Sequence, residues 1–296
     1  MMRQLLSRDD INPEKPDNDG KTPLWGASSN GHEGVVRLLL ARDDVNPDKP
    51  DNYNRTPLWG ASSNGREGVV GLLLARDDVN PDKPDNDCET PLLSASMYGR
   101  EEVVRLLLAR GDVNPDKPDT KGQTPLWWVS MGGHVGAVRL LLTRSDVNPD
   151  KPDRYGGTPL WWASSNGHEG VVSLLLARDD VNPDKSDNDG RTPLWGASVN
   201  GHEGVVRLLL VRDGLNPDTP DNDGKTPLWG ASFHGHEGVV RLLLVQDDVN
   251  PNNPDNDGTT PLCIASGGAH EEVVRLLLAR DVVSPDKPDN RGRTPP

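Results

Sequence analysis

One tripeptide, Thr-Pro-Leu, returns every 34 residues along the chain. It begins at Thr22, Thr56, Thr90, Thr124, Thr158, Thr192, Thr226 and Thr260, and Thr294-Pro295 opens a ninth copy. Self-similarity at a fixed period of this size is the signature of a solenoid, in which each repeat packs only against its neighbours. We therefore predict a linear array of one repeated unit.

Counting each unit from the aspartate before this motif gives eight complete repeats, predicted to form one array over residues 17–288. The units are 17–50, 51–84, 85–118, 119–152, 153–186, 187–220, 221–254 and 255–288. Residues 1–16 are interpreted as a partial repeat with only the second helix and the loop, and residues 289–296 as the start of a further repeat. Two explanations stay open: a piece of a longer protein, or a complete product of recent unit duplication.

Each unit carries the signals of two short helices and a loop. Thr22 is a typical helix N-cap and Pro23 a typical first helical residue, while Gly31 supplies the left-handed conformation that ends a helix. From Glu33 to about Arg42, Val and Leu recur at helical spacing and predict a second helix. Pro, Asp and Asn then predict a projecting loop. The fold class is an all-α repeat solenoid of stacked antiparallel helix pairs with projecting β-hairpin-like loops.

The composition agrees with this architecture. Hydrophobic residues make up 33% and aromatic residues 4% of the chain, which is too little for two ordinary globular cores. A helix pair this short cannot bury its Val/Leu face alone, so neighbouring pairs must stack. The core is then a continuous ribbon, which needs fewer apolar residues.

The net charge of -14 argues against a nucleic-acid partner and against an acidic membrane surface. Cys88 and Cys263 are too few and too far apart for a disulfide framework, and no apolar run reaches membrane-spanning length or forms a signal-peptide core. We expect a monomer that binds neither nucleic acid nor membrane. Its expected location is the cytoplasm, with the nucleus as the alternative.

Two short motifs resemble parts of catalytic or nucleotide sites and lack the residues that complete them. Residues 20–22, Gly-Lys-Thr, match the end of a phosphate loop, but Lys15 stands where its first glycine is required. His32 is followed by glutamate as in a zinc-protease helix, but Val36 stands where the second histidine ligand is required. We therefore predict no catalytic residue and no enzyme activity.

A third motif resembles part of a calcium loop. Residues 17–20, Asp-Asn-Asp-Gly, have alternating oxygen ligands and a glycine, but Lys15 occupies the first ligand position and Gly26 the terminal glutamate position. The expected reading is a solvated acidic loop, and we predict no cofactor and no specific metal site.

The order Thr-Pro-Leu-x-x-Ala, Gly-His, Val-Val-x-Leu-Leu-Leu and Asp-Val-Asn resembles the ankyrin repeat over essentially the whole chain. The resemblance implies L-shaped stacks of helix pairs with β-hairpin tips, which bind proteins on the concave face. The chain departs from the family pattern by an Arg-Asp pair after the second helix and by an added Pro-Asp-Lys-Pro segment. The usual histidine after Thr-Pro-Leu is tryptophan here, except at Leu93 and Cys263, and the tryptophans are Trp25, Trp59, Trp127, Trp161, Trp195 and Trp229.

This tryptophan column predicts a packing feature. The next residue is glycine at Gly26, Gly60, Gly196 and Gly230, and we expect the missing side-chain volume to accommodate an indole of the same or the adjacent unit. Because the column recurs in nearly every unit, we interpret it as core rather than as a ligand box.

The columns that differ between units are candidates for specific contacts, because columns that must pack repeat faithfully. They are unit positions 2, 3 and 5, at the loop tip, and 13 and 14, at the end of the first helix; all three tyrosines and the only phenylalanine fall in them. Aromatic residues and Met commonly carry interface energy. We predict one patch around Met97, Tyr98 and Met131, flanked by Tyr53 and Tyr155, and a second, more distant anchor at Phe233 and His234. The full set of predicted partner-binding residues is Tyr53, Arg55, Met97, Tyr98, Lys121, Gln123, Met131, Arg154, Tyr155, Phe233 and His234.

The leading hypothesis is a protein–protein interaction scaffold that binds a partner on the concave face formed by loop tips and first helices. The acidic loops favour a partner with a basic or mixed-charge surface. One alternative is a sensor or adaptor portion of a larger signalling or ubiquitin-ligase protein. Another is a structural or weakly cation-binding acidic rod, and neutral drift after duplication is the competing explanation for the variable columns.

Overall fold

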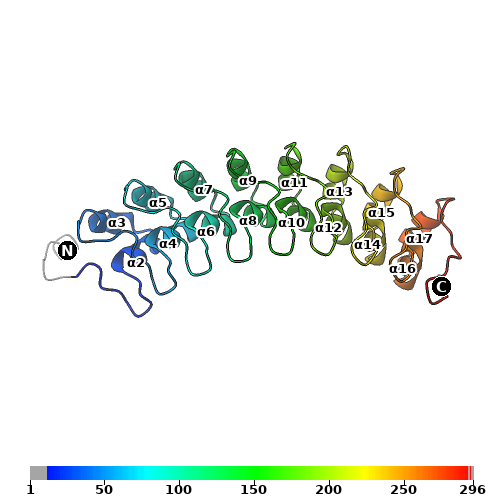
Figure 1. Cartoon of the computed structure of the whole chain (residues 1–296), viewed down its shortest axis with the longest axis horizontal. Coiled ribbons are helices and arrows are strands. Elements are labelled where there is room, and N and C mark those ends of the chain that lie inside the picture. Colours follow the sequence, from blue (N-terminus) through cyan, green and yellow to red (C-terminus); the bar gives the residue numbers. More distant parts are fainter. Residues whose placement is uncertain (1–11, 293, 295–296) are drawn as a thin grey trace. The chain divides into compact units, whose positions relative to one another are not determined.

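The computed structural model describes residues 12–292 and residue 294, which form sixteen α-helices and no β-strand. The helices follow one another in antiparallel pairs, each pair succeeded by a loop (Figure 1). The chain divides into two compact units, Met1–Asn148 and Pro149–Pro296. Most of the predicted partial repeat 1–16, and part of the predicted further repeat 289–296, lie outside the described residues.

The first unit contains four helix pairs. Its first helices are α2 (Pro23–Asn30), α4 (Pro57–Ser63), α6 (Pro91–Met97) and α8 (Pro125–Met131). Its second helices are α3 (Glu33–Leu40), α5 (Glu67–Leu74), α7 (Glu101–Leu108) and α9 (Val135–Leu142). First helices pack on neighbouring first helices and second helices on second helices, so the unit is a double row.

The second unit repeats this arrangement. Its first helices are α10 (Pro159–Ser165), α12 (Pro193–Val199), α14 (Pro227–Phe233) and α16 (Pro261–Gly267). Its second helices are α11 (Glu169–Leu176), α13 (Glu203–Leu210), α15 (Glu237–Leu244) and α17 (Glu271–Leu278). Here too each helix packs against its equivalent in the next pair. The all-α repeat solenoid is therefore confirmed.

The first helices begin as the sequence predicts. The buried Thr22 Oγ1 accepts a hydrogen bond from the backbone N–H of Trp25 at 3.1 Å, and Pro23 occupies the first turn. The other seven Thr-Pro-Leu motifs form the same cap. Gly31 adopts φ 79°, so the left-handed end is also as predicted.

The second helices are shorter than predicted. The first of them ends at Leu40 rather than near Arg42. Ala41 leaves the helical ψ range at −4°, and the guanidinium of Arg42 instead forms a bidentate pair with Asp44 at 2.8 Å. Of the Arg42-Asp43 dipeptide that departs from the family pattern, the arginine therefore pairs with the following Asp44 in the turn after the helix.

The loops contain turns, and none of the described residues forms the strand pairing that a β-hairpin would have. Their backbone groups are satisfied between loops instead: the N–H of Asn222 donates to the carbonyl of Asp189 in the preceding loop at 2.9 Å. The prolines of the added segments, two in each except the segment that ends in Ser186, have no N–H to offer a strand ladder. The "hairpin" expectation is corrected to a row of stacked turns.

A second ladder ties the added Pro-Asp-Lys-Pro segments together. The carboxylate of Asp82 accepts the backbone N–H of Asn114 in the next repeat at 2.8 Å, and Lys117 donates to the carbonyl of Asp82 at 3.0 Å. Equivalent bonds join Asp48 to Asn80 and Asp150 to Asn182. The segment that lengthens the repeat thus connects consecutive repeats.

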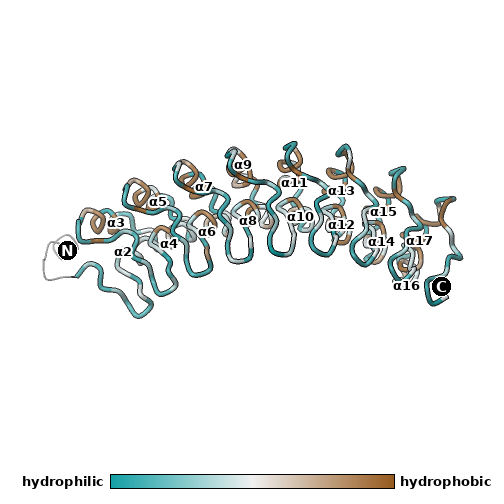
Figure 2. The backbone as a smooth tube through the Cα atoms, in the orientation of Figure 1, coloured by the Kyte–Doolittle hydropathy of each residue, from teal (hydrophilic) through white to brown (hydrophobic). Residues whose placement is uncertain are grey.

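Apolar residues of both helices meet between the two rows. Leu58, Val70 and Leu73 have no exposed surface, and their equivalents in other units are buried similarly. Figure 2 shows the hydrophobic residues concentrated in the helices and the hydrophilic residues in the loops. No helix in the described part of the chain is long and apolar enough to cross a membrane.

The predicted fit of indoles against glycines holds at one position. A Cβ atom at Gly60 would lie 3.4 Å from Trp25 of the preceding repeat, but one at Gly26 would meet nothing within 4 Å. At Gly196 and Gly230 the nearest atoms belong to Ser165 and Val199, the last residues of the preceding first helices. At Gly196 and Gly230 the absence of a side chain therefore lets the end of the preceding first helix pack closely, because its last residue lies nearer than any indole.

Candidate functional site

The loop tip of residues 51–55 is held rigidly by one buried aspartate. Asp51 Oδ1 accepts the backbone N–H groups of Tyr53 and Arg55 at 2.9 and 3.0 Å, while its Oδ2 pairs with the Arg55 guanidinium at 2.7 Å. The Arg55 guanidinium lies 4.7 Å from the Tyr53 ring and 5.3 Å from the Trp59 ring. Tyr53 is consequently presented at the tip with 59% of its surface exposed.

A similar tip in the second unit presents Tyr155. Asp153 Oδ1 accepts the N–H groups of Tyr155 and Gly157 at 2.8 and 3.0 Å. Gly157 leaves space for the Trp162 indole, whose Nε1 donates to Asp153 Oδ2 at 3.1 Å. Arg154 lies 4.7 Å from the Tyr155 ring, and Tyr155 is 54% exposed. Trp162 thus bonds the Oδ2 atom of Asp153, as Arg55 does for Asp51 in the first unit.

The predicted patch of Met97, Tyr98 and Met131 lies at the ends of two packed helices. Met97 is the last residue of α6 and Tyr98 its C-cap, and Tyr98 is 51% exposed. Met131 is the last residue of α8, which packs on α6. Met97 and Met131 are partly exposed. These three side chains therefore stand at equivalent ends of neighbouring first helices.

The loop before α8 carries two further predicted residues, which differ in accessibility. Asp119 Oδ1 accepts the N–H groups of Lys121 and Gln123 at 2.8 and 2.9 Å. Lys121 is exposed, whereas Gln123 is only 8% exposed, and its side-chain oxygen has no hydrogen-bond partner among the described residues. The prediction that Gln123 lies on the contact surface is therefore corrected, because this side chain is buried.

The second predicted anchor lies at the end of α14. Phe233 is the last residue of that helix, is 46% exposed and stacks on Trp229 with ring centroids 5.5 Å apart and an interplanar angle of 15°. His234 is the C-cap and is exposed. Tyr53, Met97, Tyr98 and Met131 belong to the first unit, while Tyr155 and Phe233 belong to the second. The proximity of Tyr155 to Tyr98 stays a prediction.

Glu89 is a residue that the repeat comparison overlooked. Burial raises its pKa to about 7, aided by the charges of Asp85, Asp87 and Asp119 and opposed by Lys121. The signal was present in the sequence: Glu89 is an acid at unit position 5, where four other units have Lys or Arg. It also follows Cys88, which has a free thiol and a φ of 65°.

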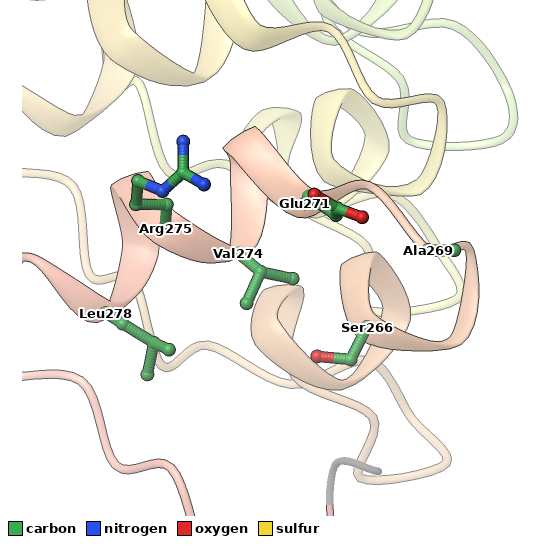
Figure 3. A pocket seen from close by; sticks show the side chains of 6 residues that line it. All are labelled: Ser266, Ala269, Glu271, Val274, Arg275 and Leu278. Atoms are coloured by element: carbon green, nitrogen blue, oxygen red, sulfur yellow. The ribbon is translucent and has the colours of Figure 1, made fainter.

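Three surface hollows lie in the second unit. One of about 470 Å³ has apolar walls from Val274 and Leu278 and a charged rim from Glu271 and Arg275 (Figure 3). A second, of about 370 Å³, lies between two loop tips and is lined by Asp189, Arg191, Trp195, Asp221, Asn222, Asp223 and Lys225. A third, of about 400 Å³, is lined by Gly235, Glu237, Ala269, His270, Glu271, Glu272, Val273 and Arg275.

None of these surfaces gathers the donors of a metal centre. Within residues 12–292, no three His, Cys, Asp or Glu side chains are grouped so that they could hold a metal ion. The histidines at the start of the second helices serve as links between repeats instead: His202 Nε2 donates to the Ser165 carbonyl at 3.0 Å.

Comparison with known families decides the identity of this repeat. A model of three tandem ankyrin repeats matches residues 1–85, 49–119, 74–154, 94–187 and 175–255, and a single-repeat model matches residues 257–290. The chain belongs to the ankyrin repeat family. No curated protein matches it. Ankyrin repeats are generally protein–protein interaction modules and typically lack enzymatic activity.

The departures from the ankyrin pattern now have structural roles. The tryptophan that replaces the usual histidine links adjacent ankyrin repeats, since Trp25 Nε1 donates to the Arg55 carbonyl of the next repeat at 3.0 Å. The added loop segment supplies the Asp82–Asn114 type of link. These two kinds of hydrogen bond therefore connect consecutive ankyrin repeats through their loops.

Proposed function

We propose that this ankyrin array is a protein-binding scaffold whose contact surface consists of the loop tips and the carboxyl ends of the first helices. One observation carries the proposal. The exposed aromatic side chains Tyr53, Tyr98, Tyr155 and Phe233 all stand at these positions. Large aromatic side chains in partly exposed, fixed positions are typical energetic anchors of protein interfaces.

The rigidity of the tips supports this function. The Asp51 and Asp153 carboxylates fix the backbone of their tips before any partner arrives. Preorganised contacts lose less conformational entropy on association, so they contribute more to affinity. The tips therefore suit binding better than flexible loops of the same composition would.

The charge of the tips supports a basic or mixed-charge partner. The side chains of Asp189 and Asp223, at position 3 of their repeats, are 67% and 72% exposed although they pair with Arg191 and Lys225, so these tips present both signs of charge. The chain as a whole has a net charge of -14. A basic partner surface would be attracted over a distance of roughly one Debye length. We retain the monomeric state and the cytoplasmic location, with the nucleus as alternative, as parts of the proposal.

Partner capture followed by measurement on a purified pair tests the proposed surface. A captured protein is purified, and its dissociation constant is measured for the wild type and for Met97→Ser/Tyr98→Ser/Met131→Ser. We expect the triple variant to bind about tenfold more weakly or worse, as for a disrupted hot spot. Helicity is checked by circular dichroism to establish that the fold is retained.

The chain offers a matched control on a different surface. Val211 and Val245 follow the second helices α13 and α15 and are 77% and 67% exposed. The variant Val211→Ser/Val245→Ser removes comparable exposed apolar surface away from the proposed contact. It should leave the dissociation constant unchanged, and equal weakening by both variants would contradict the assignment of the surface.

Two alternative roles predict different results. A weakly cation-binding acidic rod would show saturable calcium binding with a change in thermal stability, which the scaffold proposal does not require. A sensor or adaptor portion of a larger protein would use the same surface but transmit its occupancy elsewhere. Calcium titration tests the first alternative. Reading the gene for an adjoining in-frame coding sequence tests the second.

A further inference from the structure

Two aromatic rings at the end of α14 form an open corner. The Phe233 and His234 rings are 4.7 Å apart and nearly perpendicular, at 83°. One face of the Phe233 ring stacks on Trp229, and His234 in turn stacks on His236 with centroids 5.8 Å apart. The corner is therefore supported from behind by two further rings, while Phe233 and His234 are both exposed.

The backbone of the corner is also fixed. His270 Nε2, at the start of α17, donates to the Phe233 carbonyl at 3.0 Å. The next first helix, α16, packs on α14 and ends in Gly267, at the unit position that corresponds to Phe233. A Cβ atom on Gly267 would meet nothing within 4 Å, so the surface beside the corner is open rather than filled by a side chain.

The third hollow adjoins this corner. Gly235, directly after His234, lines it, and so does His270, which is bonded to Phe233. Three carboxylates line it as well, from Glu237, Glu271 and Glu272. Arg275 and, at 3.7 Å, Arg241 both pair with Glu272, whereas Glu237 and Glu271 form no ion pair with any described residue. The hollow therefore presents uncompensated negative charge next to two aromatic rings.

His234 does not offset this negative charge at neutral pH. Burial lowers its pKa, and the neighbouring His236 and His270 lower it further. Its ring therefore stays uncharged at pH 7 and leaves the corner open to a cationic side chain. A protonated ring in the same place would repel that cation.

We propose that the Phe233–His234 corner and the adjoining carboxylate-lined hollow bind a basic segment of the partner protein, with an arginine side chain stacked on the outer face of Phe233. The inference rests on the proposed function and specifies the chemistry of one of its anchors. A guanidinium fits better than an ammonium ion, because it is planar, stacks on aromatic faces and bonds carboxylates through two N–H groups at once. A purely apolar segment would leave the Glu237 and Glu271 charges without a partner.

The chain contains one phenylalanine, which makes the corner directly observable. Full-length protein labelled with 4-fluorophenylalanine gives a single ¹⁹F resonance from position 233. We expect the acetylated, amidated peptide Gly-Arg-Gly-Arg-Gly to shift this resonance in a saturable manner. The same peptide with citrulline in place of arginine keeps the shape but lacks the charge, and it should bind about three- to fivefold more weakly.

Two further measurements decide between occupants. The variant Glu237→Gln/Glu271→Gln should weaken the arginine peptide about threefold or more, whereas Glu33→Gln/Glu67→Gln, at the equivalent positions of the first unit, should not. A leucine peptide that shifts the resonance as strongly as the arginine peptide would show an apolar occupant and overturn the inference. An arginine peptide that produces no saturable shift up to millimolar concentration would overturn it as well.

Failure of this inference leaves the proposed function separately testable. The Met97, Tyr98 and Met131 variant addresses a surface in the first unit, and its effect on the captured partner does not depend on Phe233. Loss of binding by that variant together with an unresponsive ¹⁹F signal would reject the arginine site alone. A responsive ¹⁹F signal with no effect of the triple variant would reject the first-unit surface alone.

Discussion

The indole Nε1 of Trp25 donates a hydrogen bond to the backbone carbonyl of Arg55, 3.0 Å away and thirty residues further along the chain. The same bond joins Trp195 to the carbonyl of Lys225 at 3.1 Å. Trp59 has the same place in its repeat, but its Nε1 is buried and has no hydrogen-bond partner among the described residues. Tryptophans at the same repeat position therefore differ in one respect: the indole N–H of Trp25 and Trp195 is hydrogen-bonded, and that of Trp59 is not.

This pair gives a matched test of what the indole bond contributes. Trp195→Phe should lower the free energy of unfolding by about 1 kcal/mol more than Trp59→Phe, because it leaves the Lys225 carbonyl without its donor, while Trp59→Phe removes a buried, unpaired N–H. Both tryptophans are partly exposed, so the lost apolar area is similar. Urea unfolding of the two variants measures the difference, and equal losses would show that packing alone explains the column.

Much of the fold could be predicted because the repeat states each local signal eight times. The Thr-Pro cap at Thr22 and the left-handed Gly31 depend only on neighbouring residues, so the sequence reveals them directly. The end of the second helix at Leu40 was missed because Ala41 and Arg42 are good helix formers. The Arg42–Asp44 ion pair is not required for this end, because α15 stops at the equivalent Leu244 although Gln246 replaces the arginine. Interactions that compete with propensity are difficult to see in a sequence.

The exposure of the candidate site was partly predictable for the same reason. Columns that vary between repeats identified Tyr53 and Tyr98 as surface residues, and both are about half-exposed. The buried position of Gln123 was not predictable, because burial depends on the packing of neighbouring repeats and not on the residue type alone. The pKa of Glu89 and the hollow beside His234 depend on distances between repeats, which a single unit does not encode.

The link at the start of the second helices should tolerate one specific replacement. His202 Nε2 donates to Ser165, and in the first unit the guanidiniums of Arg66 and Arg100 donate to the equivalent carbonyls at 3.2 Å. His202→Arg should therefore keep wild-type stability, while His202→Ala should lose about 1 kcal/mol. Chemical denaturation compares the two, and an arginine variant as unstable as the alanine variant would argue against a linking role.

One of the links of the Asp82–Asn114 type has asparagine in place of the aspartate, and it suggests a stabilising substitution. Burial raises the pKa of Asp82, whose Oδ1 is buried and has no hydrogen-bond partner among the described residues. In the repeat 221–254, Asn252 has the equivalent position: its Oδ1 accepts the N–H of Ser284 and its Nδ2 donates to the Val282 carbonyl at 2.6 Å. An asparagine can thus satisfy both side-chain atoms where an aspartate satisfies one.

Asp82→Asn should accordingly raise the free energy of unfolding by about 1 kcal/mol at pH 7, since it removes a partly buried charge and pairs the orphan atom. Asp77→Asn makes the same charge change at an exposed residue of the same loop and should have little effect. The urea midpoint of each variant measures the change. A destabilised Asp82→Asn protein would show that the negative charge itself holds the ladder, through Lys117.

Glu89 should make stability depend on pH near neutrality. Its pKa is about 7 in the folded chain against a reference of 4.5, so the folded state favours the protonated side chain. A raised pKa of this kind contributes stability that is fully present below pH 4.5 and is lost as the pH rises through 7. Replacing Glu89 with the permanently neutral glutamine should therefore leave stability near pH 5 almost unchanged and raise it at pH 8.

The expected gain of Glu89→Gln over the wild type at pH 8 is about 1 kcal/mol, after allowance for screening by solvent at this partly exposed side chain. Thermal unfolding at pH 5 and pH 8 measures it, and taking the difference between variant and wild type cancels the titration of all other groups. Glu67→Gln, at an exposed residue of α5, provides the control with the same chemical change. If both variants respond alike to pH, neither burial nor the acidic neighbours Asp85, Asp87 and Asp119 raise the pKa of Glu89, and the pH dependence must have another origin.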